Sequence, residues 1–126
     1  MNQISLMPGD NRLSLATIPD NSIDSCVCDP PYGLVSITKR FGKEGSAPAR
    51  TEKNDGSFAR LSGGFMNRAW DSTGIENDPA FWAEVLRVLK PGAYIVAFSS
   101  SRTFHRMATA IEDAGFITHP MIGWCY

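Results

Sequence analysis

Ten consecutive residues set the expected architecture of this chain: Ile23-Asp24-Ser25-Cys26-Val27-Cys28-Asp29-Pro30-Pro31-Tyr32. Residues 23–28 form a short apolar run that predicts a buried strand, and the four residues after it would end the strand in a stiff turn. Ligands of open α/β sheets bind just outside the carboxyl ends of the strands. A carboxylate, two prolines and an aromatic ring at that point predict a functional site, although the same residues also suit a plain strand-ending turn.

The chemistry that suits this set is to hold the exocyclic amine of a nucleobase. The Asp29 carboxylate and the Pro30 carbonyl offer acceptors for the two N–H groups of such an amine. Holding both N–H groups directs the nitrogen lone pair at an electrophile, and Asp29 stabilises the positive charge that the amine gains as it attacks. Tyr32 offers a flat face on which an extruded base stacks, and Pro31 stiffens the turn between them.

Capping residues and apolar residues at helical spacing predict three helices. For one of them Asp78 is placed as the N-cap and Pro79 as the first residue, and Lys90-Pro91-Gly92 ends it. The predicted helices cover residues 12–18, 79–89 and 102–114.

Apolar runs between these helices predict three strands. They cover residues 23–28, 93–98 and 116–126, the last one broken at Pro120. The continuous apolar run 93–98 is typical of a strand buried on both faces of a parallel sheet. The alternation of strands and helices predicts an α/β fold with a mostly parallel sheet and flanking helices. Ser99-Ser100-Ser101 would then face the same side as Asp29, either lining a pocket or capping the next helix.

A long basic segment, residues 33–77, separates Tyr32 from the helix at Pro79. Between Lys39 and Arg68 there are seven basic residues against three acidic ones, although the formal net charge of the whole chain is −1. Such a length in a small domain predicts a functional or mobile loop. One interpretation is that Lys39, Arg40 and Lys43 bind a phosphate backbone, and the alternative is a solvated loop.

Composition points to one globular domain. The chain has 126 residues, of which 43% are hydrophobic and 20% charged. The amino end shows neither a basic region nor a long apolar stretch, which predicts a cytoplasmic protein with no signal peptide and no membrane span. Its three cysteines, expected to be reduced and mostly buried, and the isolated His105 and His119 do not complete a metal site.

In their order, these motifs resemble the amino-terminal part of the amino-methylating DNA methyltransferases, in the arrangement where the catalytic motif precedes the cofactor motif (the β group). The resemblance spans nearly the whole chain. It is carried by Gly9-Asp10, residues 22–24, Asp29-Pro30-Pro31-Tyr32, Phe65-Met66, Trp70-Asp71, Phe81-Trp82, and residues 87–92, 101–106, 111–116 and Trp124.

The resemblance implies a Rossmann-like methyltransferase fold that uses S-adenosylmethionine to methylate adenine N6 in double-stranded DNA. It assigns the amine and base contacts to Asp29, Pro30, Pro31 and Tyr32. It places Asp10 and Asn11 near the adenine of the cofactor, and Asp29 near its methionine part. An Asp at the first motif position favours adenine, and N4 of cytosine is the alternative acceptor.

The chain departs from the family in one main respect. The glycine-rich cofactor loop, a Phe-x-Gly-x-Gly pattern, is absent from these residues. The resemblance therefore implies an incomplete catalytic domain that needs a carboxyl-terminal complementing segment or a homodimer. Ala93 and Ser99-Ser100 stand where the family often has glycine. The remaining alternative is a non-catalytic remnant that binds DNA or a partner protein.

Overall fold

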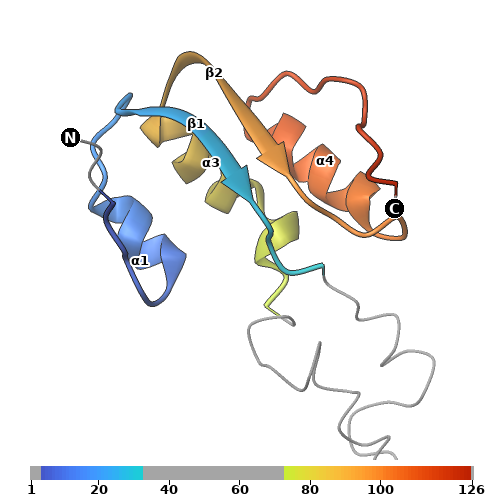
Figure 1. Cartoon of the computed structure of the whole chain (residues 1–126), viewed down its shortest axis with the longest axis horizontal. Helices are drawn as coiled ribbons and strands as arrows, with labels where there is room; N and C mark the ends of the chain where they lie inside the picture. The colour runs from blue at the N-terminus through green and yellow to red at the C-terminus, as the bar shows by residue number, and fades with distance from the viewer. Residues whose placement is uncertain (1–3, 33–72, 126) are drawn as a thin grey trace, which may run out of the picture.

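The computed structural model describes residues 4–32 and 73–125, which form a small α/β unit (Figure 1). The six elements, in chain order, are α1 (Asn11–Ala16), β1 (Ile23–Cys28), the 3-10 helix η4 (Ile75–Asn77), α3 (Pro79–Val88), β2 (Leu89–Ala97) and α4 (Phe104–Asp113). Strands β1 and β2 pair in parallel, as the sequence predicts. The predicted loop 33–77 lies largely outside the described residues, and its last three residues form η4.

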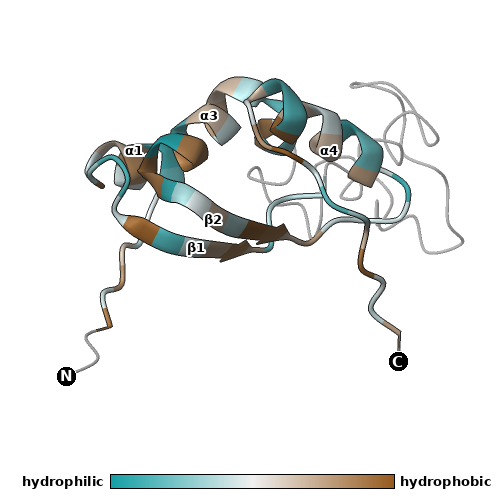
Figure 2. Cartoon of the chain, turned by 90° about the horizontal axis from the view of Figure 1, so that it is seen from above, coloured by the Kyte–Doolittle hydropathy of each residue, from teal (hydrophilic) through white to brown (hydrophobic). Residues whose placement is uncertain are grey.

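All three α-helices lie on one face of the sheet (Figure 2). The core fills the space between them and consists mainly of Trp82, Val85, Leu89, Met107, Ala110 and Ile111. The opposite face is open among the described residues: Val27 is 72% exposed and Tyr94 68% exposed. The prediction that residues 93–98 are buried on both faces is therefore wrong, because no described helix covers the second face.

The boundary between α3 and β2 differs from the prediction. Asp78 caps α3 as expected, since its Oδ1 accepts a hydrogen bond from the Ala80 N–H at 2.9 Å. The helix ends at Val88 and the strand begins at once with Leu89, which pairs with Ile23. Lys90-Pro91-Gly92 thus lies inside β2, at a register shift opposite β1. Gly92 has a φ of 82°, a conformation that glycine adopts without steric cost.

The strand predicted over residues 116–126 does not form in residues 116–125. Phe116 packs against the core, but the apolar side chains after it face outward, with Ile117 88% and Ile122 87% exposed. Pro120 has no N–H to donate to a neighbouring strand, and nothing in the described chain pairs with this segment. An apolar run without a pairing partner is not enough to make a strand.

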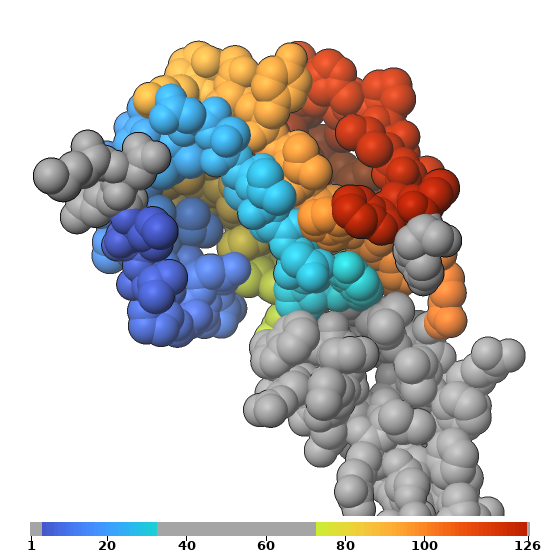
Figure 3. Space-filling model, viewed as in Figure 1, coloured from blue at the N-terminus to red at the C-terminus, as the bar shows by residue number. Residues whose placement is uncertain are grey.

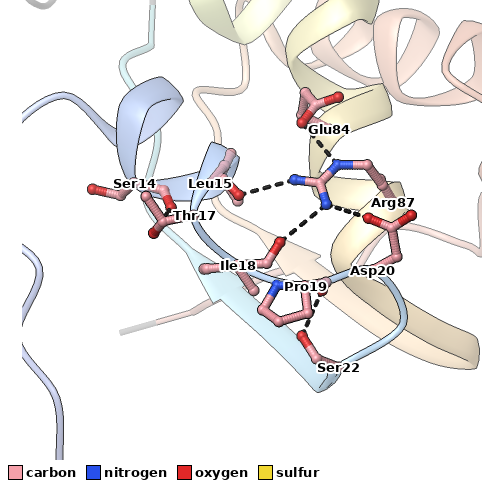
Figure 4. A network of polar contacts seen from close by, with 9 residues as sticks. All are labelled: Ser14, Leu15, Thr17, Ile18, Pro19, Asp20, Ser22, Glu84 and Arg87. Carbon is pink, nitrogen blue, oxygen red and sulfur yellow. Dashed lines mark hydrogen bonds and ion pairs between the residues drawn. The ribbon is translucent and has the colours of Figure 1, made fainter.

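The side chain of Arg87 joins helix α1 to the end of α3 (Figure 4). Its guanidinium donates to the carbonyl oxygens of Leu15 at 2.9 Å and Ile18 at 3.0 Å. It also forms ion pairs with Asp20 at 2.5 Å and Glu84 at 2.9 Å, and these carboxylates raise the pKa of Arg87. The carbonyl groups at the end of a helix lack partners within the helix, so Arg87 supplies donors where α1 ends.

We expect Arg87→Met to lower the urea midpoint of unfolding without changing the slope of the transition. The variant keeps the apolar stem but removes the donors that hold the end of α1. Arg12→Met is the matched control, because Arg12 is 62% exposed and its ion pair, with Asp10, is local. Equal midpoints for the two variants, measured by far-UV circular dichroism, would show that Arg87 does not join the helices.

No helix within residues 4–32 or 73–125 has the length and hydropathy to cross a membrane.

Candidate active site

The carboxyl ends of β1 and β2 meet at one edge of the sheet. Cys28, the last residue of β1, pairs with Ala97, and its carbonyl accepts a hydrogen bond from the Phe98 N–H at 3.0 Å. Asp29 and Ser99 therefore leave the sheet side by side. The structure thus places Asp29-Pro30-Pro31-Tyr32 at the strand ends, where the sequence predicts a site.

The turn itself is accessible and only partly covered. Asp29 is exposed, and Pro30, Pro31 and Tyr32 are half-buried. Atoms of residues 29–32 reach the surface on the face seen in Figure 3. A hydrogen bond to the Asp29 carboxylate raises the pKa of the Tyr32 phenol, with burial as a second cause. The carboxylate that the sequence singles out thus acts on the Tyr32 phenol.

A residue at the start of α4 forms a hydrogen bond with this turn. Thr103 Oγ1 donates a hydrogen bond to the Tyr32 carbonyl oxygen at 2.8 Å. Sequence reasoning predicts no individual role for Thr103: it belongs to the motif 101–106 and lies inside the helix predicted over residues 102–114. The structure instead makes Thr103 the N-cap of α4, a position that threonine often occupies.

Ser100 holds the turn that leads into α4 through both its carbonyl and its hydroxyl. Its carbonyl accepts the N–H groups of Thr103 at 3.1 Å and Phe104 at 2.9 Å, and its Oγ accepts the Arg102 N–H at 3.2 Å. The Ser100 hydroxyl therefore bonds within the turn before α4 and does not cap the helix, whose N-cap is Thr103. This turn also explains why α4 begins at Phe104 and not at residue 102.

Helix α1 directs its amino end to the same edge. Its carboxyl end connects through a short turn to the start of β1, so the two run in opposite directions (Figure 1). Asp10 is the N-cap of α1, and its Oδ1 accepts the Arg12 N–H at 3.0 Å. Its Oδ2 accepts from the Arg12 guanidinium at 2.6 Å, and these bonds lower the pKa of Asp10 to about 2. Asp10 is therefore a carboxylate at ordinary pH, with Arg12 beside it.

Comparison of the chain with protein-family models, with curated proteins and with solved structures gives no match. The site is thus defined by its own residues and geometry. Lys39, Arg40 and Lys43, the predicted DNA contacts, lie outside the described residues, as do the motifs Phe65-Met66 and Trp70-Asp71.

The cysteines are free thiols, and no group of three or more metal-ligating side chains occurs within the described chain. Cys26 and Cys28 are half-buried on β1, while Cys125 is exposed, so the expectation of mostly buried cysteines is wrong for Cys125. A hydrogen bond from the Cys28 thiol lowers the pKa of Cys26 to about 7, and the same bond raises the pKa of Cys28.

Proposed function

We propose that this chain is the catalytic-motif portion of a DNA methyltransferase that acts on adenine N6. The observation that carries the proposal is the position of Asp29-Pro30-Pro31-Tyr32, a stiff turn at the carboxyl ends of two parallel strands, with the phenol against the carboxylate. The α/β arrangement is compatible with a piece of a Rossmann-like methyltransferase fold.

The residues of the turn would bind and orient the target amine. The Asp29 carboxylate has room for more than one donor, because a carboxylate accepts several hydrogen bonds and the Tyr32 phenol provides one. One amine N–H would bind Asp29 and the other the Pro30 carbonyl, whose position two adjacent prolines restrict. The base, extruded from the duplex, would stack on Tyr32.

S-adenosylmethionine would supply an electrophilic methyl group when bound. The amine nitrogen would take this methyl group as the bond from the methyl carbon to sulfur breaks. Asp29 would stabilise the positive charge that develops on the amine nitrogen, which then releases one proton to solvent. No strong base is required for this step, because the lone pair and not an N–H bond is what attacks.

Three residues at this edge would hold the cofactor. The exposed Asp29 carboxylate suits the ammonium group of its methionine part, and Asp10 with Asn11 suits its adenosine part. The fit is partial for Asp10, since Arg12 already donates to both of its oxygens. Lys39, Arg40 and Lys43 would contact phosphates of double-stranded DNA. A carboxyl-terminal complementing segment, or a second copy of the chain, would complete the pocket.

Analysis of the methylated product tests this function. We expect the chain, mixed with the glycine-rich carboxyl-terminal portion of a β-group methyltransferase, to place labelled methyl groups on N6 of adenine in duplex DNA. Nucleoside digestion followed by mass spectrometry identifies the base. Methyl groups on N4 of cytosine would favour the alternative acceptor. DNA binding without any methyl transfer would instead favour a non-catalytic module.

A further inference from the structure

The hydroxyl of Thr103 bonds across the candidate site and not to its own helix. Thr103 occupies the N-cap of α4, where a threonine side chain usually accepts an N–H of the first helical turn. Here its side chain makes no capping bond. It donates instead to the carbonyl of Tyr32, 71 residues away in the sequence, at 2.8 Å.

The two residues before Tyr32 explain why a hydrogen bond from another segment holds its backbone. Pro30 and Pro31 have no N–H, so they cannot donate backbone hydrogen bonds that would fold the turn onto itself. The backbone at Thr103 is itself held in place, because the N–H groups of Thr103 and Phe104 both donate to the Ser100 carbonyl. Further along, α4 is anchored in the core by Met107, which is 6% exposed.

We propose that Thr103 is a positioning residue that fixes Tyr32 against Asp29 so that a stacked base presents its amine to the carboxylate, a role that rests on the proposed function. Tyr32 is then held at two points, its carbonyl by Thr103 and its phenol by Asp29. Without the Thr103 hydroxyl, the hydrogen bond to the Tyr32 carbonyl is lost. The ring can then shift relative to the carboxylate, which changes the geometry of transfer more than the affinity for DNA.

Two substitutions separate the hydroxyl from the shape of the side chain. Thr103→Val removes the donor and keeps the volume, and Thr103→Ser keeps the donor. Thr103→Ala is a second variant without the hydroxyl, and far-UV circular dichroism verifies that each variant is folded. The first readout is the absorbance titration of the tyrosines at alkaline pH. The chain has three tyrosines, and Tyr32→Phe identifies which step belongs to Tyr32.

We expect the pKa of Tyr32 to be raised in the wild type and in Thr103→Ser, and to move toward 10.0 in Thr103→Val and Thr103→Ala. Asp29 is the charged group that raises it, so the titration reports the contact between the two side chains. In the product assay with the complementing portion, methyl transfer by Thr103→Val should fall by about tenfold in kcat, with KM for DNA changed much less.

An unchanged Tyr32 titration in both hydroxyl-free variants would overturn the role of Thr103, even if the wild type transfers methyl groups. Equal losses in Thr103→Ser and Thr103→Val would also overturn it, because the serine retains the donor. A wild type that shows a raised Tyr32 pKa but no methyl transfer would overturn the proposed function, and with it the positioning of a base. The titration therefore tests the role of Thr103, and the transfer assay of the wild type tests the proposed function, so the two can fail independently.

Discussion

Asp29→Asn is expected to lower methyl transfer to duplex DNA by about 10²–10³-fold, because it removes the negative charge that meets the developing charge on the amine. The substitution keeps the shape and one acceptor oxygen, so binding of DNA should change little. Rates are measured with labelled S-adenosylmethionine in the presence of the complementing carboxyl-terminal portion. A loss in kcat that exceeds the change in KM is the expected signature.

Asp24→Asn is the matched control for this variant. Asp24 lies near the start of β1, and Asp29 follows the other end of this strand. The Asp24 carboxylate pairs with Lys90 at 2.5 Å. It is 84% exposed, so its loss should be nearly silent. If Asp24→Asn and Asp29→Asn reduced the rate equally, the effect would be one of general charge or folding. Full activity in Asp29→Asn would contradict the role of Asp29 outright.

Trp82→Ala should lower the free energy of unfolding by about 3–5 kcal/mol, the usual cost of deleting a large buried ring. Trp82 is 1% exposed and lies in the centre of the core between α3 and α4. Its Nε1 donates a buried hydrogen bond to the Glu76 carbonyl at 3.0 Å, which ties η4 to α3. Because small domains are only marginally stable, this loss approaches the whole stability of the chain.

The control for Trp82 is the same substitution at the surface. Trp124 is 80% exposed in the carboxyl-terminal segment, so Trp124→Ala should change stability by less than about 0.5 kcal/mol. Urea titration followed by circular dichroism measures both variants. A large loss in Trp124→Ala would indicate that Trp124 packs on the domain in solution, contrary to its exposure in the structure.

Local signals in the sequence were sufficient where local chemistry decides the structure. Asp78-Pro79 located the start of α3, because a cap and an N1 proline act within one helical turn. The turn after β1 and its place at the strand ends followed from Asp29-Pro30-Pro31. By contrast, β2 begins at Leu89 because that residue pairs with Ile23, a contact between segments far apart in the chain.

The candidate site shows the same division. The residue types in Asp29-Pro30-Pro31-Tyr32 indicate a site, but the sequence cannot show that Thr103 bonds to Tyr32 or that Arg87 joins α1 to α3. Both contacts join residues far apart in the sequence: Thr103 and Tyr32 are 71 positions apart, and Arg87 and Leu15 are 72 positions apart. The strand expected over 116–126 is absent from residues 116–125 for a related reason: its apolar pattern is present, but no strand within residues 4–32 or 73–125 pairs with it.

Calorimetric titration of the chain with S-adenosylmethionine tests the central claim most directly, since it asks whether this edge binds the methyl donor. We expect saturable binding that weakens in Asp29→Ala and in Asp10→Ala and is unchanged in Asp24→Ala. No heat of binding at millimolar cofactor, or equal binding in all of these variants, would contradict a cofactor site built from Asp10 and Asp29.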